Sequence, residues 1–349
     1  MIEYSTRQIF FDKEAELLNK IHFECGVRLT FREDISNMNW ITDSNGSYCI
    51  CQHFPDASEL KSYLLSYKRA YELIIISPDE ITAKNVNSLI YSARLLCYPQ
   101  FNFNEHTLIE VKDADEFVKI GGNFEEWFVQ KEITSNMILA CLIAARASNA
   151  NLNFALEKYK FSLNLDWFTP HSANPYYGQV FYTGLESNKS NVTKIYAFLS
   201  AYSIVEELGM DIRSSSKMPR FINDKWNSIV LDDLKLRLDK IGLDIDTKME
   251  WLIRGDSNPL YDKIQPQFTT KSQYYNPSNN VYDLELKIYE AIHYGSYIRN
   301  FFLAHKTNEI VKFINPYDIH NIQSLVRILL LSSTGVWNCM VNYREMLTS

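Results

Sequence analysis

The sequence predicts an α+β protein, in which a mixed α/β domain is followed by an all-α helical bundle. Short β-rich runs alternate with turn signals over roughly the first 120 residues, whereas long helical spacings dominate after about residue 125. The chain has 349 residues, a length typical of two domains, and only 11 Gly and 10 Pro. We therefore expect a mixed α/β domain over 1–180 and the helical bundle over 181–349.

In the first domain, helical spacings and short β-rich runs follow each other closely. Asp43–Gly46 is a turn signal between two β-rich segments, which indicates a hairpin. Pro78 suits the first turn of a helix, because its ring fixes φ near the helical value. The expected elements are helices over Lys13–Phe23 and Ser58–Arg69, a hairpin over Met38–Phe54, strands over Leu73–Ile76 and Thr107–Val111, and a helix opened by Ser77–Asp79.

The second half of the chain has helical spacings with clear stops. Val192–Met210 repeats apolar residues every three or four positions, and Gly209 is suited to end that helix. Gly242 ends the charged helix expected over Trp226–Lys240 in the same way. The remaining expected elements are a buried helix over Trp127–Ala147, an extended segment over Tyr159–Phe168, loops over His171–Tyr177 and Asp256–Asn280, and two closing helices over Tyr282–Lys306 and Tyr317–Tyr343.

Composition and charge exclude several protein classes. The first residues are acidic and lack the apolar core of a secretory signal, and no apolar run approaches the roughly 20 residues of a membrane span. Residues 181–349 carry 19 Lys and Arg and 19 Asp and Glu, so the net charge of −7 arises in residues 1–180. This balance argues against non-specific nucleic-acid binding. We expect a soluble, cytoplasmic protein with no membrane partner, whose six cysteines are free thiols.

The segment Tyr297–Asn308 carries the most specific pattern. Arg299 is followed directly by Asn300 and, six positions on, by His305. On a helical wheel counted from Leu284, Arg299 and His305 lie about 60° on either side of an apolar stripe and about 9 Å apart along the axis. Asn300 points away from that stripe. The two outer side chains are therefore placed to meet a group that lies across the seam of a helix pair.

An arginine, a polar residue and then a histidine after a short spacer mark the HEPN superfamily of helical-bundle domains, and the segment from Arg299 to His305 resembles that motif. The resemblance extends over the C-terminal half by architecture. It implies metal-independent RNA cleavage without a cofactor, as in toxins and in defence against phage. His305 would exchange protons with the ribose 2′-hydroxyl and the departing oxygen, Arg299 would hold the phosphate, and Asn300 would orient either partner.

The resemblance also implies partners. Two HEPN domains pair so that their motifs meet, which implies a homodimer through the C-terminal bundle. RNA is the expected substrate. The N-terminal domain would then be a sensor or regulatory domain, with an antitoxin or a trigger molecule as its partner.

Three further residues are candidate substrate contacts. Arg254, just before Gly255, either binds phosphate from an exposed loop or ties that loop to the bundle. Tyr297 either stacks on a base or packs against a neighbouring helix. Lys306 adds a positive charge directly after His305.

A structural interpretation of the motif competes with the catalytic one. Arg299 would then pair with a carboxylate such as Glu285 or Asp318, and His305 would be solvated or bind a carbonyl. The protein would be a non-catalytic dimerisation or RNA-binding regulatory protein built on the same fold.

A metal site is a weaker alternative. Cys49, Cys51 and His53 share one face of an expected strand, and thiolates with an imidazole suit zinc. The usual second pair of ligands is missing, and buried cysteines that pack as small hydrophobes are commoner. The sequence holds no glycine-rich phosphate loop, HExxH or GxSxG motif, which argues against nucleotide hydrolases, zinc proteases and esterases.

Overall fold

The chain folds into two compact units that divide between Leu152 and Asn153 in the computed structural model. The residues that the structure describes are 1–10, 15–34, 70–97, 108–111, 137–165, 188–254, 264, 274–276, 281–300 and 314–337.

The first unit is built on a four-stranded antiparallel sheet with the strand order β2-β3-β1-β4. β3 lies inside the sheet, and its pairing with β1 runs from Ile2 opposite Ser77 to Phe10 opposite Tyr71. Leu73 and Ile75 of β3 are fully buried, which confirms the strand expected there. The strands are β1 (Ile2–Phe10), β2 (Arg28–Asp34), β3 (Ala70–Ser77) and β4 (Ile109–Glu110).

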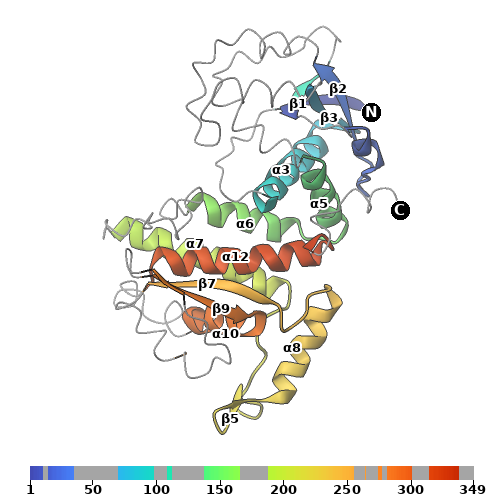
Figure 1. The fold of residues 1–349 in the computed structure, drawn as a ribbon. Coiled ribbons are helices and arrows are strands. Elements are labelled where there is room, and N and C mark those ends of the chain that lie inside the picture. Colours follow the sequence, from blue (N-terminus) through green and yellow to red (C-terminus); the bar gives the residue numbers. More distant parts are fainter. Residues whose placement is uncertain are drawn as a thin grey trace. The chain divides into compact units, whose positions relative to one another are not determined.

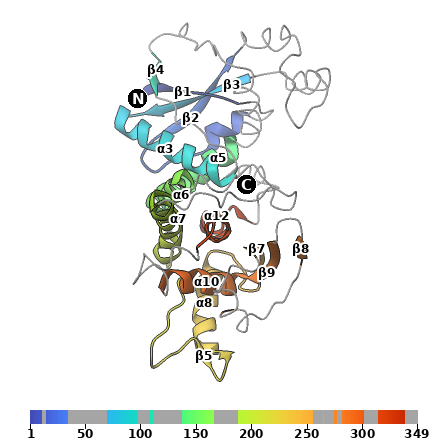
Figure 2. The same cartoon turned by 90° about the vertical axis from the view of Figure 1, so that its left-hand side faces the viewer.

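Two helices pack on this sheet from one side (Figure 2). α3 (Glu80–Cys97) contacts β1 and β3, and α5 (Met137–Asn149) packs against α3. The helix expected after Pro78 is confirmed as α3, and the Asp79 carboxylate accepts from the Thr82 N–H at 2.8 Å in its first turn. The helix expected from Lys13 is a short 3₁₀ helix, η1 (Ala15–Lys20).

Four more elements are expected in this half: two are present, and two lie outside the described residues. The strand expected at 107–111 is present as β4, and the described part of the helix expected over 127–147 is α5. The hairpin over 38–54 and the helix over 58–69 lie outside the described residues.

The second unit is organised around α12 (Pro316–Ser333). Figures 1 and 2 show α12 between a helix pair, α6 (Asn153–Leu165) and α7 (Asn188–Glu207), and a layer formed by β7 and α10. The Asn315 side chain accepts from the Tyr317 N–H at 2.9 Å and so caps the start of α12. Leu325, Leu329 and their apolar neighbours are fully buried, as the apolar pattern of this helix predicts.

The stops read from the sequence are confirmed. Gly209 and Gly242 follow α7 and α8 (Ser228–Lys240) with φ of 66° and 69°. Only glycine adopts that left-handed conformation without a steric penalty. Gly335, with φ of 68°, ends α12 in the same way.

The expectation of an all-α second half is wrong, although the α+β class is confirmed. A three-stranded antiparallel sheet with the order β7-β9-β8 lies in this unit, together with a small hairpin of β5 and β6. The strands are β5 (Phe221–Ile222), β6 (Lys225–Trp226), β7 (Lys248–Arg254), β8 (Tyr274–Asn276) and β9 (Val281–Lys287).

The closing helix expected over 282–306 therefore begins later than predicted. Leu284 and Leu286 of β9 are buried, whereas Glu285 and Lys287 are half-exposed, which is the two-residue period of a strand. The helix, α10, spans Ile288–Ile298. Leu284 and Ile288 are four residues apart, a spacing that puts two residues on the same face of a helix and also on the same face of a strand. The sequence pattern therefore places Leu284 on a helix although it lies in a strand.

The segment expected to be extended at 159–168 is helical in its described part. Residues through Leu165 belong to α6, whose Leu156, Tyr159 and Leu163 are buried at helical spacing. The Ser162 hydroxyl donates to the Ala197 carbonyl at 2.7 Å, so α6 is joined to α7. The two compact units divide before α6, whereas the sequence pattern predicts a domain boundary at residue 180. Among the helices of the described ranges, none combines the length and the apolar character that a bilayer crossing requires.

Candidate functional site

Helix α10 leads directly into the motif and packs unusually close to its neighbours. A Cβ atom added to Gly295 would lie 2.9 Å from Ile322 Cδ1 of α12 and 3.3 Å from Tyr202 Cδ2 of α7. Contacts of that length between carbon atoms are repulsive, so a glycine at 295 is what permits the approach. The end of α10 is thereby held against both α7 and α12.

Ser296 is the centre of a polar network on this helix. Its Oγ accepts from Arg220 Nη2 at 2.8 Å and from Asn300 Nδ2 at 3.3 Å. It also hydrogen-bonds the Tyr202 side chain, and because both acceptor positions are taken, its own proton is the one left for Tyr202. Burial raises the pKa of Tyr202 to about 12, so its hydroxyl stays protonated at neutral pH.

Arg299 and Asn300 continue the network towards the surface. Arg299 Nη1 donates to Asn300 Oδ1 at 2.9 Å, and Nη2 lies 3.2 Å from a Glu206 carboxylate oxygen on α7. The Arg299 side chain is 40% exposed, which leaves its guanidinium within reach of solvent. The backbone at Arg299 and Asn300 forms a π-helical turn, a feature that is frequent at functional sites.

Arg220 approaches the same serine from the loop before β5. Its Nη1 lies 3.2 Å from His293 Nδ1, and its Nε donates to Ser214 Oγ at 3.0 Å. Because a guanidinium only donates, Nδ1 of His293 is the acceptor and the neutral ring carries its proton on Nε2. Burial, followed by the charge of Arg220, lowers the pKa of His293 to about 3.

The β5–β6 hairpin fixes His293 from its other sides. The rings of Phe221 and Trp226 lie edge-on to the imidazole, at centroid distances of 5.2 and 5.1 Å. Asn223 and Asp224 join the two strands with φ of 51° and 60°, the geometry of a type I′ turn. Asn and Asp tolerate this conformation better than other non-glycine residues, so the local sequence encodes the hairpin.

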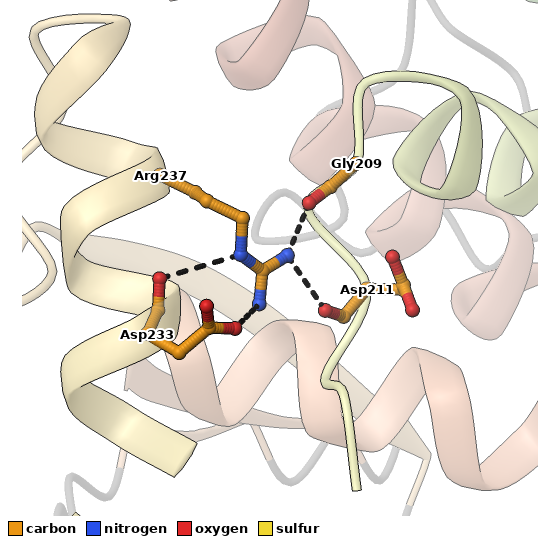
Figure 3. A network of polar contacts seen from close by, with 4 residues as sticks. All are labelled: Gly209, Asp211, Asp233 and Arg237. Atoms are coloured by element: carbon orange, nitrogen blue, oxygen red, sulfur yellow. Dashed lines mark hydrogen bonds and ion pairs between the residues drawn. The ribbon is translucent and has the colours of Figure 1, made fainter. Parts of the chain in front are cut away.

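The loop that leads to Arg220 is anchored by an arginine of α8 (Figure 3). Arg237 Nη1 donates to the backbone carbonyls of Gly209 and Asp211, the second at 2.9 Å. Its Nη2 lies 2.7 Å from a carboxylate oxygen of Asp233, one turn earlier on α8. The loop leaving α7 is therefore tied to α8 at its start.

The predicted site residues are distributed as follows. Arg299 and Asn300 are in direct contact, and Tyr297, half-buried, lies in α10 two residues before Arg299. Arg254 is the last residue of β7, in register with Val281, and not part of an exposed loop. The carboxylate on Arg299 is Glu206, and not Glu285 or Asp318, the two examples that the structural interpretation of the sequence gives. Asn300, expected to point away from the site, bonds both Ser296 and Arg299.

His305 and Lys306 lie outside the described residues, as do Cys49, Cys51 and His53 of the zinc alternative.

The sequence interpretation missed Arg220, His293 and Ser296. Arg220 is separated from His293 and Ser296 by 73 and 76 positions, so no local spacing links them. One local signal was present. The dipeptide Asn223-Asp224 between two aromatic-containing pairs, Phe221-Ile222 and Lys225-Trp226, favours a hairpin and would have indicated a fixed position for Arg220.

The first unit contains a buried charge of its own. Glu72, in β3, is fully buried and accepts from the Ser5 hydroxyl and from Arg32 Nε. Arg94 of α3 is also buried, and desolvation lowers its pKa to about 10. These groups lie among the strands and helices of the core, which is the environment of structural ion pairs.

The network around Ser296 has the chemistry of an anion site. Two guanidinium groups, an amide and a hydroxyl come from α10, from the turn that follows it and from the loop before β5. Within the described ranges, Glu206 is the one carboxylate that contacts them. Guanidinium groups bind phosphate oxygens through two parallel N–H donors. Comparison of the chain with protein-family models, curated proteins and solved structures gives no match.

Proposed function

We propose that the protein is a metal-independent endoribonuclease of the toxin or defence type, with the motif from Arg299 to His305 as half of a composite site. The observation that carries the proposal is that the Arg299 guanidinium is both held in one orientation and accessible to solvent. The side chain is 40% exposed, and it is oriented by Asn300 and Glu206 at the end of a tightly packed helix. An oriented arginine of this kind is suited to hold a phosphate as charge develops on it.

The proposed reaction needs no metal. His305, as a base, takes the proton from a ribose 2′-hydroxyl, and the 2′-oxygen attacks the adjacent phosphorus. The bond from phosphorus to the 5′-oxygen breaks, and that oxygen receives a proton from a second imidazole. The products are a 2′,3′-cyclic phosphate and a free 5′-hydroxyl, and DNA is not cut because it lacks the 2′-hydroxyl.

The second imidazole is proposed to come from a second copy of the chain. Each motif supplies one arginine and one histidine, and two histidines allow one to act as base while the other acts as acid. In this proposal the C-terminal half forms the homodimer. The N-terminal half senses a trigger or binds an antitoxin, and so regulates the nuclease.

The experiment is an RNA cleavage assay with the purified full chain in EDTA. Wild type should cut RNA and leave cyclic phosphate ends, whereas DNA of the same sequence should stay intact. His305→Ala should abolish cutting with little change in the melting temperature, and His22→Ala, which changes an exposed histidine, should cut normally. Cutting by His305→Ala at the wild-type rate would show that the assignment is wrong.

A second candidate function is favoured by the ion pair itself. Arg299 has a carboxylate partner in Glu206, as an arginine with a structural role would. The protein would then be a non-catalytic dimerisation or RNA-binding regulator. In that case Arg299→Ala should cost several kcal/mol of folding free energy, well above the roughly 1 kcal/mol of an exposed pair, and neither wild type nor any variant should cut RNA.

A further inference from the structure

Arg220 is a partly buried cation that contacts only neutral partners among the described residues. Its Nε, Nη1 and Nη2 are bonded to Ser214 Oγ, His293 Nδ1 and Ser296 Oγ, and no described carboxylate forms an ion pair with it. The charge of Asp211 acts on Arg220 from a distance and tends to raise its pKa, but less than burial lowers it. A charge taken partly out of water without a counter-charge is costly, so binding of an anion at this position would stabilise the protein.

The guanidinium also has donors to spare. An arginine offers five N–H groups, and the three contacts above use three of them. One N–H remains on each terminal nitrogen. Burial lowers the pKa of Arg220, yet an arginine stays charged at any physiological pH, so the charge itself persists.

Arg220 and Arg299 are linked by two neutral side chains. Arg220 Nη2 donates to Ser296 Oγ at 2.8 Å, Asn300 Nδ2 donates to the same oxygen at 3.3 Å, and Asn300 Oδ1 accepts from Arg299 Nη1 at 2.9 Å. Because Ser296 and Asn300 are neutral, they orient both guanidinium groups without cancelling either charge. Glu206 offsets one of the two positive charges and leaves the other uncompensated.

A purely structural role explains this arrangement less well. The hairpin after Arg220 is already held against α10, because Phe221 and Trp226 pack on His293 and Trp226 packs on Tyr289. A neutral side chain that donates to Ser296 would complete the same contact without burying a charge.

We propose that Arg220 and Arg299, bridged by Ser296 and Asn300, form a binding site for a phosphate-type anion. This inference rests on the proposed function for its identification of that anion as a phosphodiester of RNA. In that setting Arg220 is a binding residue, placed beside the reacting phosphate by the loop that leads to β5.

The test uses inorganic phosphate, whose binding requires no RNA and no cleavage. The full chain is titrated with phosphate against chloride at constant ionic strength, and the unfolding midpoint is followed. Wild type should show a rise of about 3 °C at saturating phosphate. Arg220→Gln should bind phosphate at least about fivefold more weakly, because it removes one of two charged contacts.

The matched control is Arg213→Gln. It removes the same charge from an exposed side chain on the same segment, and it should keep the wild-type affinity. The proposal is overturned by any of three results: no phosphate-specific rise in wild type, unchanged affinity in Arg220→Gln, or an equal loss in Arg213→Gln.

A second variant covers the case in which Arg220→Gln does not fold. Arg220→Lys keeps the charge but loses the planar fork, so it should also bind phosphate at least about fivefold more weakly, whereas Arg213→Lys should not. Wild-type affinity in Arg220→Lys would overturn the proposal. If wild type binds phosphate, the Arg220 variants bind it more weakly and wild type does not cut RNA, this inference holds and the proposed function is contradicted. If wild type cuts RNA but the Arg220 variants bind phosphate as tightly as wild type, the proposed function holds and this inference is overturned.

Discussion

The side chains of Arg299 and Asn300 are hydrogen-bonded to each other, Nη1 to Oδ1 at 2.9 Å, although the residues are adjacent in the chain. Adjacent residues on a helix point about 100° apart, so the contact requires the long arginine side chain to fold back towards the amide. Asn300 is itself fixed by its bond to Ser296. The arginine and the polar residue of the motif therefore form one unit.

The first prediction concerns this unit. Asn300→Ala should lower kcat/KM for RNA cleavage by about tenfold or more, because it removes a hydrogen bond that orients the charged group. Folding stability should fall by less than about 1 kcal/mol, since Asn300 is half-exposed. Steady-state cleavage and urea unfolding measure the two effects. Asn300→Gln keeps a neutral amide with an acceptor for Arg299 and a donor for Ser296, so it should retain more activity than Asn300→Ala; the opposite order would contradict this role.

The second prediction concerns the close approach of α10 to α12. Gly295→Ala should destabilise the protein by about 1–3 kcal/mol, because the new methyl group would lie 2.9 Å from Ile322 Cδ1. Thermal unfolding measures the change. Ile322→Val removes that Cδ1 atom, so the double variant should be less destabilised than the sum of the two single variants. Strict additivity would argue against the contact.

The third prediction concerns the arginine that anchors the loop after α7. Arg237→Gln should cost about 2–4 kcal/mol of folding free energy, because Arg237 is buried and its loss leaves the Gly209 and Asp211 carbonyls without their donor. Urea unfolding provides the measurement. Arg213→Gln changes the charge equally at an exposed position and should alter stability by less than about 0.5 kcal/mol. Similar losses in the two variants would show that charge, and not the carbonyl contacts, is responsible.

The fourth prediction concerns pH. Burial holds the pKa of His293 at about 3 in the folded protein, against an ordinary value of 6.5. Between these values the unfolded chain takes up a proton that the folded protein does not, so the contribution of His293 to stability falls as the pH falls. From about pH 7 to about pH 5 the loss should be about 2 kcal/mol.

Urea unfolding at the two pH values tests this prediction. His293→Gln keeps an acceptor for Arg220 but cannot titrate, so its stability should fall by about 2 kcal/mol less than that of wild type over the same range. His22→Gln, at an exposed position, should follow wild type. An identical pH response in wild type and His293→Gln would contradict a buried neutral imidazole.

Elements with strong local determinants were predictable from the sequence. The helix after Pro78, the stops at Gly209 and Gly242 and the buried helix from Pro316 all depend on a residue's own backbone preference or on a long apolar pattern. Short segments were less predictable. Val281–Lys287 and α10 follow each other directly, and the spacing of Leu284 and Ile288 satisfies a strand and a helix equally well.

The candidate site likewise has a part that the sequence predicts and a part that only the tertiary structure decides. The sequence by itself placed Arg299, Asn300 and the small Gly295 in one local segment. The hydrogen bond between Arg299 and Asn300 appears only in the structure, because the wheel places Asn300 away from the stripe. The tertiary structure alone decided that Arg220 and Glu206 complete the network, since both are brought to α10 by the packing of α7 and the β5–β6 hairpin. Contacts across such distances in the chain depend on how buried surfaces fit together, and residue spacing does not record that fit.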